Sequence, residues 1–494
     1  MQGNGAEGDE EYMVFNHGIH RIHGMTVLLV LLFGVAVSAV AAEPGITVEA
    51  RQRYPWNGLV DLHFTITGTS GTKYDTSFTA KDMVGGTNVA MKTIRKSNGV
   101  AAEEKEKLLP GTYNWVWDAA ADLPDGFKCD RMTVTGTADI SAFPYTVKFN
   151  ANGGTGTMAN QSFTYGTAKA LTANVFTRTG YVFQGWATSA SGGKVYNDKQ
   201  KVQDLTTTSG AVVNLYAVWK AALYMVIDLS SGANSSKYPV SYLNAVPSGG
   251  WSDTYKTTKL VLRRIEPGAF MMQGKYNVTL TKPFYIGVFE VTQKQYILIT
   301  GNNPSTLKGD CRPVEVDYID IRGGAQGCNW PQSSVVDETS FLGRIQSKTG
   351  MNVDIPTEAQ WEYTCRAGTH TDLYSEESVK KLGRFSDNRT DGKGGYTTGH
   401  TTVGLYLSNA WGVYDMYGNQ WEWCLDYYVD PFSCSATDPK GPNKSNYGVG
   451  GYRVIRGGSH LNPSDSISSL WRMCLQQYTS TKSNYGFRLC LTIE

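Results

Sequence analysis

The sequence predicts a multidomain protein built mainly from β-strands and turns, ending in a domain that mixes strands with short helices. Three observations support this prediction. The chain has 494 residues, which is enough for about three domains with separate cores. Glycine (54) and tyrosine (29) are frequent, and charged residues make up 18%, below the usual quarter or so. Short stretches alternate polar and apolar residues, whereas long helix-forming stretches are nearly absent.

The charge balance excludes some classes of partner. Lysine and arginine number 45 against 44 aspartates and glutamates, a formal net charge of +1. A protein without a basic or acidic field lacks the electrostatic attraction that holds nucleic acid or an anionic membrane surface. We therefore expect no nucleic-acid partner.

Residues 1–42 form an N-terminal extension with a predicted signal peptide. Residues 25–42 are strongly apolar, Arg21 precedes them, and a small-x-small AVA sequence ends at Ala41. This pattern predicts cleavage near its end and a protein that is secreted or held in the cell envelope. An uncleaved anchor stays open, because 18 apolar residues just span a bilayer, and it would be the one membrane contact. Whether residues 1–24 are translated also stays open.

Residues 45–142 predict a β-sandwich-like domain. The stretches ITVEARQRY and VDLHFTITG alternate polar and apolar side chains, as strands with one buried face do. Glycine and proline at 68–71 and 110–111 supply turns between such strands. Their number and spacing favour a sandwich of immunoglobulin-like shape, without residues that indicate chemistry.

Residues 144–220 form a second module. A strand, YTVKFN, leads into the turn residues at 152–154, and RTGYVFQGWAT and NLYAVWK supply further strands. The segments NANGGTG, YGTAKAL, FTRTGYVFQGWAT and LYAVW occur in the order typical of the InlB B-repeat, or Listeria–Bacteroides repeat, which this module resembles. The resemblance implies a small β-grasp-like fold that serves as a spacer or binding module in bacterial surface and secreted proteins. We interpret residues 221–257 as a polar linker with one short strand, YMVIDL.

Residues 258–494 mix strands with short helices. LVLRRI and GAFMM flank a turn, and Thr292 is a suitable N-cap for a helix over 293–300. A 3.6-residue apolar period predicts a second helix over 336–349. Thr357 followed by Gln360 makes a capping box for a third.

Seven segments in this region carry a family resemblance. They are, in order, IEPGAFMM, PFYIGVFEVTQKQY, RPVEVDY, IPTEAQWEYTCRAGT, NAWGVYDMYGNQWEWCLD, YRVIRGGS and YGFRLC. Together they resemble the formylglycine-generating enzyme, or sulfatase-modifying factor, family across nearly the whole of 258–494. The resemblance implies an irregular α+β fold related to C-type lectins.

The same resemblance implies that the catalytic thiols of the family are missing. Active members oxidise a sulfatase cysteine to formylglycine with O₂ and a Cu(I) ion held by two thiolates, the soft ligands that Cu(I) prefers. Those cysteines lie three and eight residues after the serine of the RGGS motif. Here that serine is Ser459, so the positions are Asn462 and Ile467. The lone downstream Cys474 does not replace a pair, so we expect no catalytic residues, no copper and no cysteine oxidation.

The resemblance also implies a structural Ca²⁺ site. Mapped onto this sequence, Asp415 and Glu422 supply carboxylates, and Gly418 and Gln420 supply backbone carbonyls. Such oxygen ligands suit a hard cation. The alternative is that both carboxylates only bind the loop backbone. A second family calcium site would fall near 385–388, where the sequence departs from the pattern.

Other metal or hydrolase chemistry has little support. No close group of histidines follows the apolar segment, and no G-x-S-x-G sequence stands between a predicted strand and helix. Export would place the eight cysteines in an oxidising compartment, although sequence does not fix their connectivity. Close spacing suggests two pairs and the family resemblance a third: Cys311–Cys328, Cys424–Cys434 and Cys365–Cys474.

The favoured function is a non-catalytic binding module for an unknown glycan or protein ligand. The segment 460–485 is rich in Ser, Asn, Thr and Tyr, which suit adaptable polar contacts. The candidate groove residues are Ser459, His460, Asn462 and Arg472, and for the arginine the alternative role of packing or pinning a loop stays open. Two alternatives stay open: a divergent formylglycine-generating or other O₂- or metal-dependent oxidase, and a purely structural envelope protein.

Overall fold

The computed structural model describes most of the chain after residue 43. The described residues are 44–493 without 54–56, 124–131, 374–377, 389–397, 431, 435, 447–450 and 479–482. The predicted signal peptide lies outside them. No helix in the described part is long and apolar enough to cross a membrane. The chain forms two compact units, which meet at Ala142 and Phe143 along the sequence, with Thr207–Ser209 grouped with the first.

The first unit consists of two sheets around one apolar core. Its elements are β1 (Gly45–Gln52), β2 (Leu59–Thr67), β3 (Tyr74–Asp82), β4 (Asn88–Ala90), β5 (Ile94–Arg95), β6 (Glu106–Leu108), β7 (Gly111–Asp118), α1 (Ala119–Asp122) and β8 (Met132–Ile140). One sheet has the order β1-β2-β7-β5, and in the other β3 pairs with β4, β6 and β8. Phe64 and Trp117 are completely buried between them. The predicted β-rich character of this region is confirmed.

The second unit begins with the repeat module. Its strands are β9 (Pro144–Asn150), β10 (Gln161–Thr164), β11 (Lys169–Ala170), β12 (Tyr181–Ala187), β13 (Lys201–Val202) and β14 (Val212–Ala221). The main sheet has the order β10-β9-β14-β12. The expected turn forms at Asn152 and Gly153, whose φ angles are +48° and +85°. Trp186 is fully buried in the core of the module, as the aromatic pattern predicted.

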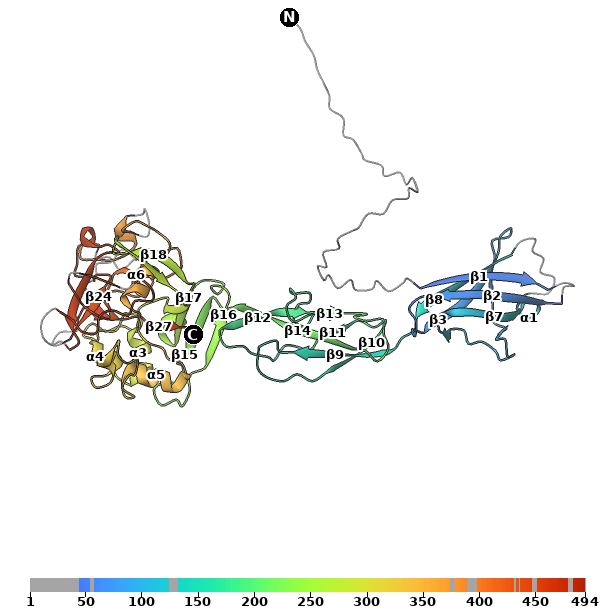
Figure 1. Cartoon of the computed structure of the whole chain (residues 1–494), viewed down its shortest axis with the longest axis horizontal. Coiled ribbons are helices and arrows are strands. Elements are labelled where there is room, and N and C mark those ends of the chain that lie inside the picture. The colour runs from blue at the N-terminus through green and yellow to red at the C-terminus, as the bar shows by residue number, and fades with distance from the viewer. Residues whose placement is uncertain are drawn as a thin grey trace, which may run out of the picture. The chain divides into compact units, whose positions relative to one another are not determined.

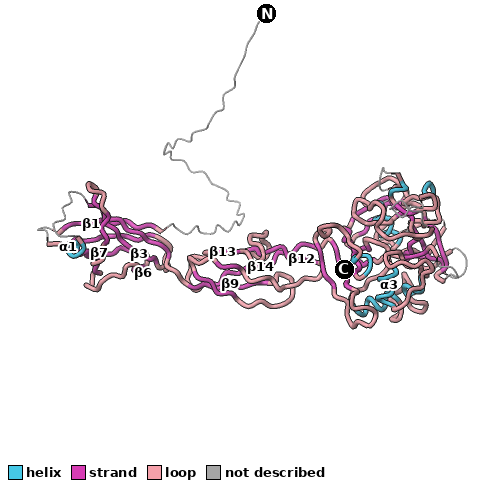
Figure 2. The backbone as a smooth tube through the Cα atoms, turned by 180° about the vertical axis from the view of Figure 1, so that it is seen from behind, coloured by secondary structure: helices cyan, strands magenta, loops and turns pink. Residues whose placement is uncertain are grey.

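Two larger sheets organise the C-terminal domain. The first, β16-β15-β17-β20-β27, is formed by Val240–Leu243, Tyr224–Asp228, Lys259–Ile265, Phe284–Gly287 and Cys490–Thr492. The second, β25-β24-β23-β26, is formed by Arg472–Gln476, Tyr452–Arg456, Trp421–Tyr427 and Tyr485–Gly486. Two small pairs join β18 (Gly268–Met272) to β19 (Tyr276–Leu280) and β21 (Gly383–Arg384) to β22 (Tyr417–Gly418). Loops and turns make up much of the rest (Figure 2).

Short helices pack beside these sheets. They are α2 (Thr254–Thr257), α3 (Gln293–Thr300), α4 (Tyr318–Arg322), α5 (Phe341–Thr349) and α6 (Glu358–Arg366), with 3-10 turns at Gly327–Asn329, Val379–Lys381 and Ser464–Ser466. Helices α3, α4 and α5 lie together along one side of the domain (Figure 1). The predicted N-cap at Thr292 and the predicted capping box at Thr357 both form, and Thr292 also forms a capping box with Gln295. The second helix starts five residues later than predicted, because the Ser340 hydroxyl caps it by accepting a hydrogen bond from Gly343 N–H.

The region interpreted as a linker, 221–257, instead contributes two strands and a helix to the C-terminal domain. Strand β15 lies inside the first sheet between β16 and β17. Met225 and Ile227 are buried in one core of the domain, and Tyr224 and Val226 in another. A short, continuous apolar run is typical of a strand covered on both faces, which explains YMVI within otherwise polar sequence.

Candidate functional site

The loop after β24 carries the RGGS motif and forms the first part of the site. Gly457 and Gly458 have φ angles of +90° and +77°, in the left-handed region that favours glycine. A Cβ at Gly458 would lie 2.4 Å from Cδ1 of Ile467, and one at Gly457 would lie 3.2 Å from the Trp361 ring. The two glycines therefore let this loop pass close to the core and place Ser459 at the end of the strand.

The two positions where the family resemblance places thiols have structural contacts here. The Asn462 side-chain oxygen accepts hydrogen bonds from Ser459 N–H at 2.9 Å and from the Ser459 hydroxyl at 3.0 Å. Ile467 is 5% exposed and packs in an apolar core beside Gly458. Asn462 thus closes the loop, and Ile467 anchors it, so both side chains hold the loop in place.

Two histidines that are far apart in the sequence meet next to this loop. The rings of His400 and His460 are 5.7 Å apart between centroids, with their planes at 77°. His400 Nε2 lies 2.8 Å from a carboxylate oxygen of Glu315, and His460 Nδ1 lies 3.0 Å from the backbone carbonyl of Asn419. His400 is completely buried, whereas His460 is 7% exposed.

The protonation of these groups follows from their surroundings. Burial raises the pKa of Glu315, but hydrogen bonds from His400 and Thr306 N–H outweigh it, so the pKa lies below its usual value. Burial lowers the pKa of His400 despite its contact with Glu315. Burial likewise lowers the pKa of His460, to about 4. Near neutral pH, the site therefore holds a carboxylate and two uncharged imidazoles.

Of the four groove candidates, Ser459, His460 and Asn462 come together in this loop, whereas Arg472 does not join them. Arg472 donates to both carboxylate oxygens of Glu358, at 2.8 and 2.9 Å, and to the Val429 carbonyl. Its guanidinium also lies 4.5 Å from the ring centroids of two aromatic residues, Tyr428 and Phe432. Arg472 therefore holds neighbouring segments together, which is the alternative role that the sequence left open for it.

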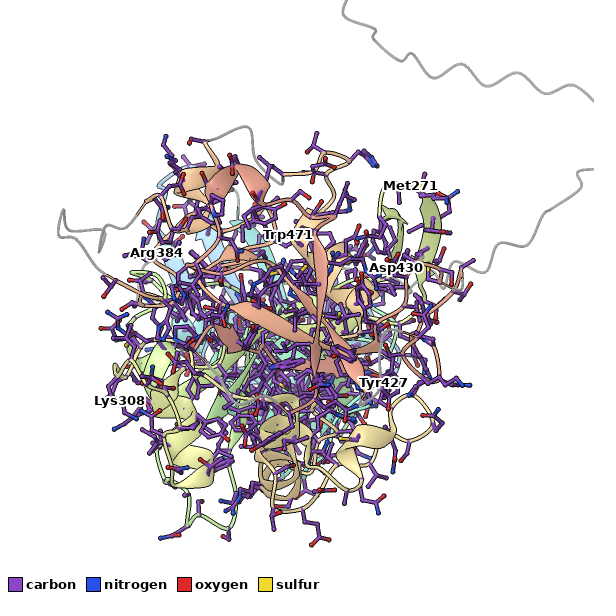
Figure 3. The ribbon with its side chains drawn as sticks, turned by 90° about the vertical axis from the view of Figure 1, so that its left-hand side faces the viewer. Met271, Lys308, Arg384, Tyr427, Asp430 and Trp471 are labelled. Carbon is purple, nitrogen blue, oxygen red and sulfur yellow. The ribbon has the colours of Figure 1, made fainter. Side chains whose placement is uncertain are left out.

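Figure 3 separates the two regions of the domain. It shows Arg384 and Asp430 on opposite sides of Trp471. Arg384 lies close enough to His460 to lower its pKa, and Asp430 adjoins Val429, whose carbonyl binds Arg472. Arg472, which binds the segment next to Asp430, therefore lies apart from His460.

The predicted calcium loop is buried and tightly bonded. Asp415 has a φ of +56°, and one of its carboxylate oxygens accepts a hydrogen bond from Gly404 N–H at 2.6 Å. The other oxygen of Asp415 is buried without a hydrogen-bond partner among the described residues. Glu422 accepts hydrogen bonds from Trp361 Nε1 at 2.7 Å and from Arg488 Nε at 2.6 Å.

A third carboxylate, which sequence reasoning missed, completes this cluster. Glu290 accepts hydrogen bonds from the Asn419 amide and from Gln420 N–H. Burial raises the pKa of Glu290 well above its usual value, and the charges of Asp415 and Glu422 raise it further. Burial also raises the pKa of Asp415, to about 6. Three buried carboxylates thus share the guanidinium of Arg488.

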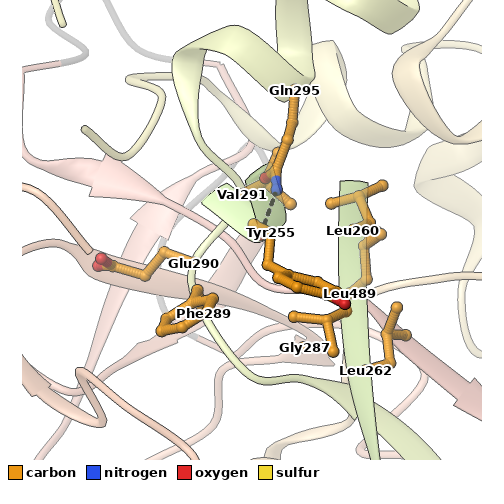
Figure 4. Close-up of a pocket in the computed structure, with 10 residues that line it drawn as sticks. Tyr255, Leu260, Leu262, Gly287, Phe289, Glu290, Val291, Gln295 and Leu489 are labelled. Carbon is orange, nitrogen blue, oxygen red and sulfur yellow. Dashed lines mark hydrogen bonds between the residues drawn. The ribbon is translucent and has the colours of Figure 1, made fainter. Parts of the chain in front are cut away.

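Glu290 also borders a small cavity of about 10 Å³, room for roughly one water molecule. In Figure 4 its carboxylate points away from Tyr255 and Leu260, which line the cavity. Gln295 donates a hydrogen bond to the Tyr255 carbonyl at 3.2 Å on the far side. The carboxylate therefore belongs to the cluster around Arg488 and not to this cavity.

The donor set of the loop fits a hard cation in part. Within the described ranges, no three His, Cys, Asp or Glu side chains are arranged as a metal site. A calcium ion would rest on the unpartnered oxygen of Asp415, on the carbonyls of Gly418 and Gln420, and on the remaining lone pairs of Glu422. When all three carboxylates are ionised, they carry two negative charges in excess of Arg488, and that is the state that a divalent cation would favour.

The seven cysteines that the structure describes are free thiols, so the three expected pairs are not formed in it. Cys365 and Cys424 are buried in the apolar core, whereas Cys474 and Cys434 are only partly buried. Burial raises the pKa of Cys365 to about 12, which makes this thiol unreactive.

The described architecture is that of a β-rich multidomain protein with an irregular, loop-rich C-terminal domain. Comparison with family models then gives the families. Residues 252–493 match the sulfatase-modifying factor enzyme 1-like domain, and residues 145–218 match the Listeria-Bacteroides repeat domain. These matches confirm both resemblances, that of the C-terminal domain to the first family and that of the preceding module to the second.

Relatives of this chain have diverse names. A serine/threonine-protein kinase pkn1 of Chlamydia pneumoniae is 35% identical over 143 residues, which are 28% of this chain and 21% of that protein. The chaperone protein LppX of Paenibacillus barcinonensis is 29% identical over 235 residues, 39% of this chain and 79% of that protein. The formylglycine-generating enzyme of Streptomyces coelicolor is 33% identical over 147 residues, which are 27% of this chain and 45% of that enzyme.

The match thus spans about a fifth of that kinase and under half of that formylglycine-generating enzyme. Among solved structures, Treponema denticola variable protein 1 is 23% identical, with a TM-score of 0.37 over 47% of this chain and 95% of that one.

Proposed function

We propose that this protein is exported and that its C-terminal domain is a binding module that does not oxidise cysteine. The observation that carries the proposal is the use of Asn462 and Ile467. The amide of Asn462 closes the RGGS loop, and the side chain of Ile467 fills the core beneath it. Neither side chain supplies the soft sulfur ligand that Cu(I) requires.

Exposed apolar side chains in the segment 460–485 support a binding role. Leu461, Met473 and Tyr478 are 57%, 46% and 66% exposed, although all three are large side chains with apolar area. They belong to the segment whose polar residues suit adaptable contacts, and exposed apolar groups among polar ones are common where proteins bind partners. The ligand class we propose is a glycan or a protein.

The names of the relatives are consistent with this proposal. A chaperone and a kinase contain matching segments alongside the formylglycine-generating enzymes. Membership of this domain family therefore does not by itself assign cysteine oxidation, and the residues of the site must decide.

The decisive experiment measures oxidation directly. Purified full-length protein, supplied with Cu(I) and O₂, is incubated with a sulfatase-type cysteine peptide, and mass spectrometry follows formylglycine. The Streptomyces coelicolor enzyme serves as the positive control. We expect no conversion. Conversion by this chain would overturn the proposal and favour a divergent oxidase, the alternative supported by the matches to formylglycine-generating enzymes.

A gain-of-ligand variant sharpens the test. Asn462→Cys combined with Ile467→Cys places thiols at both positions. We expect the double variant to bind Cu(I) where the parent chain does not, and each single variant to stay without tight binding, because one thiolate does not form the two-coordinate site. Equal Cu(I) binding by the parent chain would contradict the argument from the missing thiols.

Export is tested separately. The chain is expressed in a bacterial host with a C-terminal tag, and the N-terminus of the protein in the envelope and medium is sequenced. We expect cleavage after Ala41 or Ala42. An intact chain confined to the cytoplasm would contradict export and leave the binding role to be judged alone.

We further propose that Ca²⁺ binds at Asp415 and Glu422. An ion that binds only the folded state stabilises it by mass action. Millimolar Ca²⁺ should therefore raise the Tm of the full-length protein, and Asp415→Asn should reduce the increase. An unchanged Tm on adding Ca²⁺ after treatment with a chelator would contradict this site and support the reading of Asp415 as a loop-bonding residue.

A further inference from the structure

The histidine pair has a property that the loop does not require: each ring has one nitrogen committed and one left over. Glu315 is a carboxylate and can only accept, so Nε2 of His400 carries the proton of their 2.8 Å hydrogen bond. The Asn419 carbonyl can also only accept, so Nδ1 of His460 carries the proton of theirs.

The lone pairs are therefore on His400 Nδ1 and His460 Nε2. His400 Nδ1 is buried without a hydrogen-bond partner in the described parts of the chain. A buried acceptor left unpaired costs folding free energy. An unsatisfied lone pair in a fully covered side chain is thus a position where a ligand is expected.

The partners of the two rings are those found behind metal-binding histidines. A histidine that binds a metal through one nitrogen almost always donates its other N–H to a carboxylate or a backbone carbonyl, which fixes the tautomer. His400 donates to the carboxylate of Glu315, and His460 donates to the carbonyl of Asn419. The two neighbouring rings therefore have the two kinds of hydrogen-bond partner that metal-binding histidines have.

The spacing of the rings suits a shared ion. Two imidazoles bound to one ion at metal–nitrogen distances of about 2.0 Å have centroids roughly 5 to 5.5 Å apart for tetrahedral to trigonal angles. The observed separation of 5.7 Å exceeds this by a few tenths of an ångström. Binding of one ion therefore requires the rings to approach by a few tenths of an ångström, with His400 Nδ1 and His460 Nε2 turned toward the same point.

We propose that His400 and His460 bind a divalent transition-metal ion of the Zn²⁺ and Cu²⁺ type through these two nitrogens. Imidazole favours such ions over Ca²⁺ and Mg²⁺, which prefer oxygen. Two protein ligands leave the remaining coordination positions to water or to an incoming donor. The site adjoins the proposed calcium loop through the hydrogen bond from His460 to the Asn419 carbonyl, but it uses nitrogen ligands and not the oxygen ligands of that loop.

The charges around the two histidines make the Glu315 carboxylate necessary for binding a cation there. The guanidinium of Arg384 lies near His460 and that of Arg312 near His400, and both oppose a cation. Glu315 is the negative group in direct contact with the pair. Loss of its charge should therefore weaken metal binding although it touches the ion only through His400.

The test is calorimetric titration of metal-free, untagged full-length protein with Zn²⁺ and with Cu²⁺, in the presence of Ca²⁺ to fill oxygen sites. The background carries His17→Ala, His20→Ala and His23→Ala, because that N-terminal histidine group could bind metal by itself. We expect one ion per chain. His460→Ala should weaken binding at least tenfold, and the exposed His370→Ala should leave it unchanged.

Two further variants separate ligation from folding. His460→Gln keeps a polar side chain at a slightly exposed position and, with an unchanged Tm in the absence of metal, should still lose binding. Glu315→Gln keeps an acceptor for His400 and should weaken binding by about 10- to 100-fold, the usual cost of losing such a partner. X-ray absorption of the Zn²⁺ or Cu²⁺ complex should show two imidazole nitrogens. Absence of binding, or equal affinity in the folded His460→Gln variant, would overturn the proposal.

Discussion

Arg488 and Glu422 form a buried ion pair at the centre of the C-terminal domain, with Arg488 donating through both Nε and Nη2 to the two oxygens of one carboxylate. Neither side chain is more than 1% exposed. The same guanidinium also donates to the carbonyl of Gly287 at 2.8 Å. One ionic contact thus connects β20, β23 and the segment before β27.

Breaking this pair should cost far more than breaking a surface pair. Glu422→Gln leaves Arg488 buried without a counter-charge in direct contact, so we expect a loss of about 3–5 kcal/mol in the free energy of unfolding. The control is Glu266→Gln, whose partner Arg264 lies 2.7 Å away but whose side chain is 67% exposed. That change should cost below about 1 kcal/mol. Urea unfolding of both variants measures the difference, and equal losses would contradict it.

A second prediction concerns pH. Burial, reinforced by Glu358, raises the pKa of Asp426 to about 7, above its unfolded value. The folded state therefore binds this proton more tightly, so its contribution to stability is present below the unfolded pKa and is lost as pH rises toward 7. At roughly 1.4 kcal/mol per pKa unit, the loss is at most about 4 kcal/mol.

Asp426→Asn removes this titration while keeping an acceptor for Glu358 N–H. The variant should gain stability relative to the parent chain between pH 5 and pH 8, when unfolding is measured across that range. A constant difference between the two proteins over the range would show that Asp426 is not protonated in the folded state.

The RGGS loop yields a third prediction. Gly458→Ala forces a Cβ to within 2.4 Å of Ile467 Cδ1 and adds strain at a φ of +77°, so we expect a loss of about 1–3 kcal/mol. The double variant with Ile467→Val removes the clashing methyl group and should recover part of that loss. Gly324→Ala is the control, because among the described residues no atom lies within 4 Å of its added Cβ. Additive effects of the two changes would contradict direct contact.

A fourth prediction concerns the burial of strand β15. Met225 is completely buried, whereas Met271 on β18 is 40% exposed. Met225→Ala should lower the free energy of unfolding by about 2–5 kcal/mol through the cavity that it leaves. Met271→Ala should change it by below about 1 kcal/mol. If residues 221–257 were an exposed linker, thermal melts would show similar Tm values for the two variants.

These residues also show how far sequence reasoning reaches. The capping boxes at Thr292 and Thr357 were predictable, because the donor and acceptor lie three residues apart and need no tertiary contact. The burial of β15 was not, since the predicted strand YMVIDL is covered only because the fold places β16 and β17 on either side of it. The helix starting at Phe341 needed the Ser340 cap to fix its first turn.

The residues of the site also divide into those that the sequence predicted and those that only the fold brings together. The RGGS loop and the carboxylates of Asp415 and Glu422 followed from family motifs. The pairing of His400 with His460 did not, because 60 positions separate them and only the fold brings the rings within 5.7 Å. Glu290 was missed for the same reason, as it reaches the predicted calcium loop from the segment after β20.

The position of β15 has a practical consequence for anyone who isolates the C-terminal domain. The family match begins at residue 252, but Tyr224–Asp228 already supply an interior strand of its first sheet. A fragment cut at the homology boundary would expose unpaired backbone on β17 and open the cavity that Met225 and Ile227 fill. Such a fragment should be insoluble or prone to aggregate, so recombinant versions should start no later than Ala222.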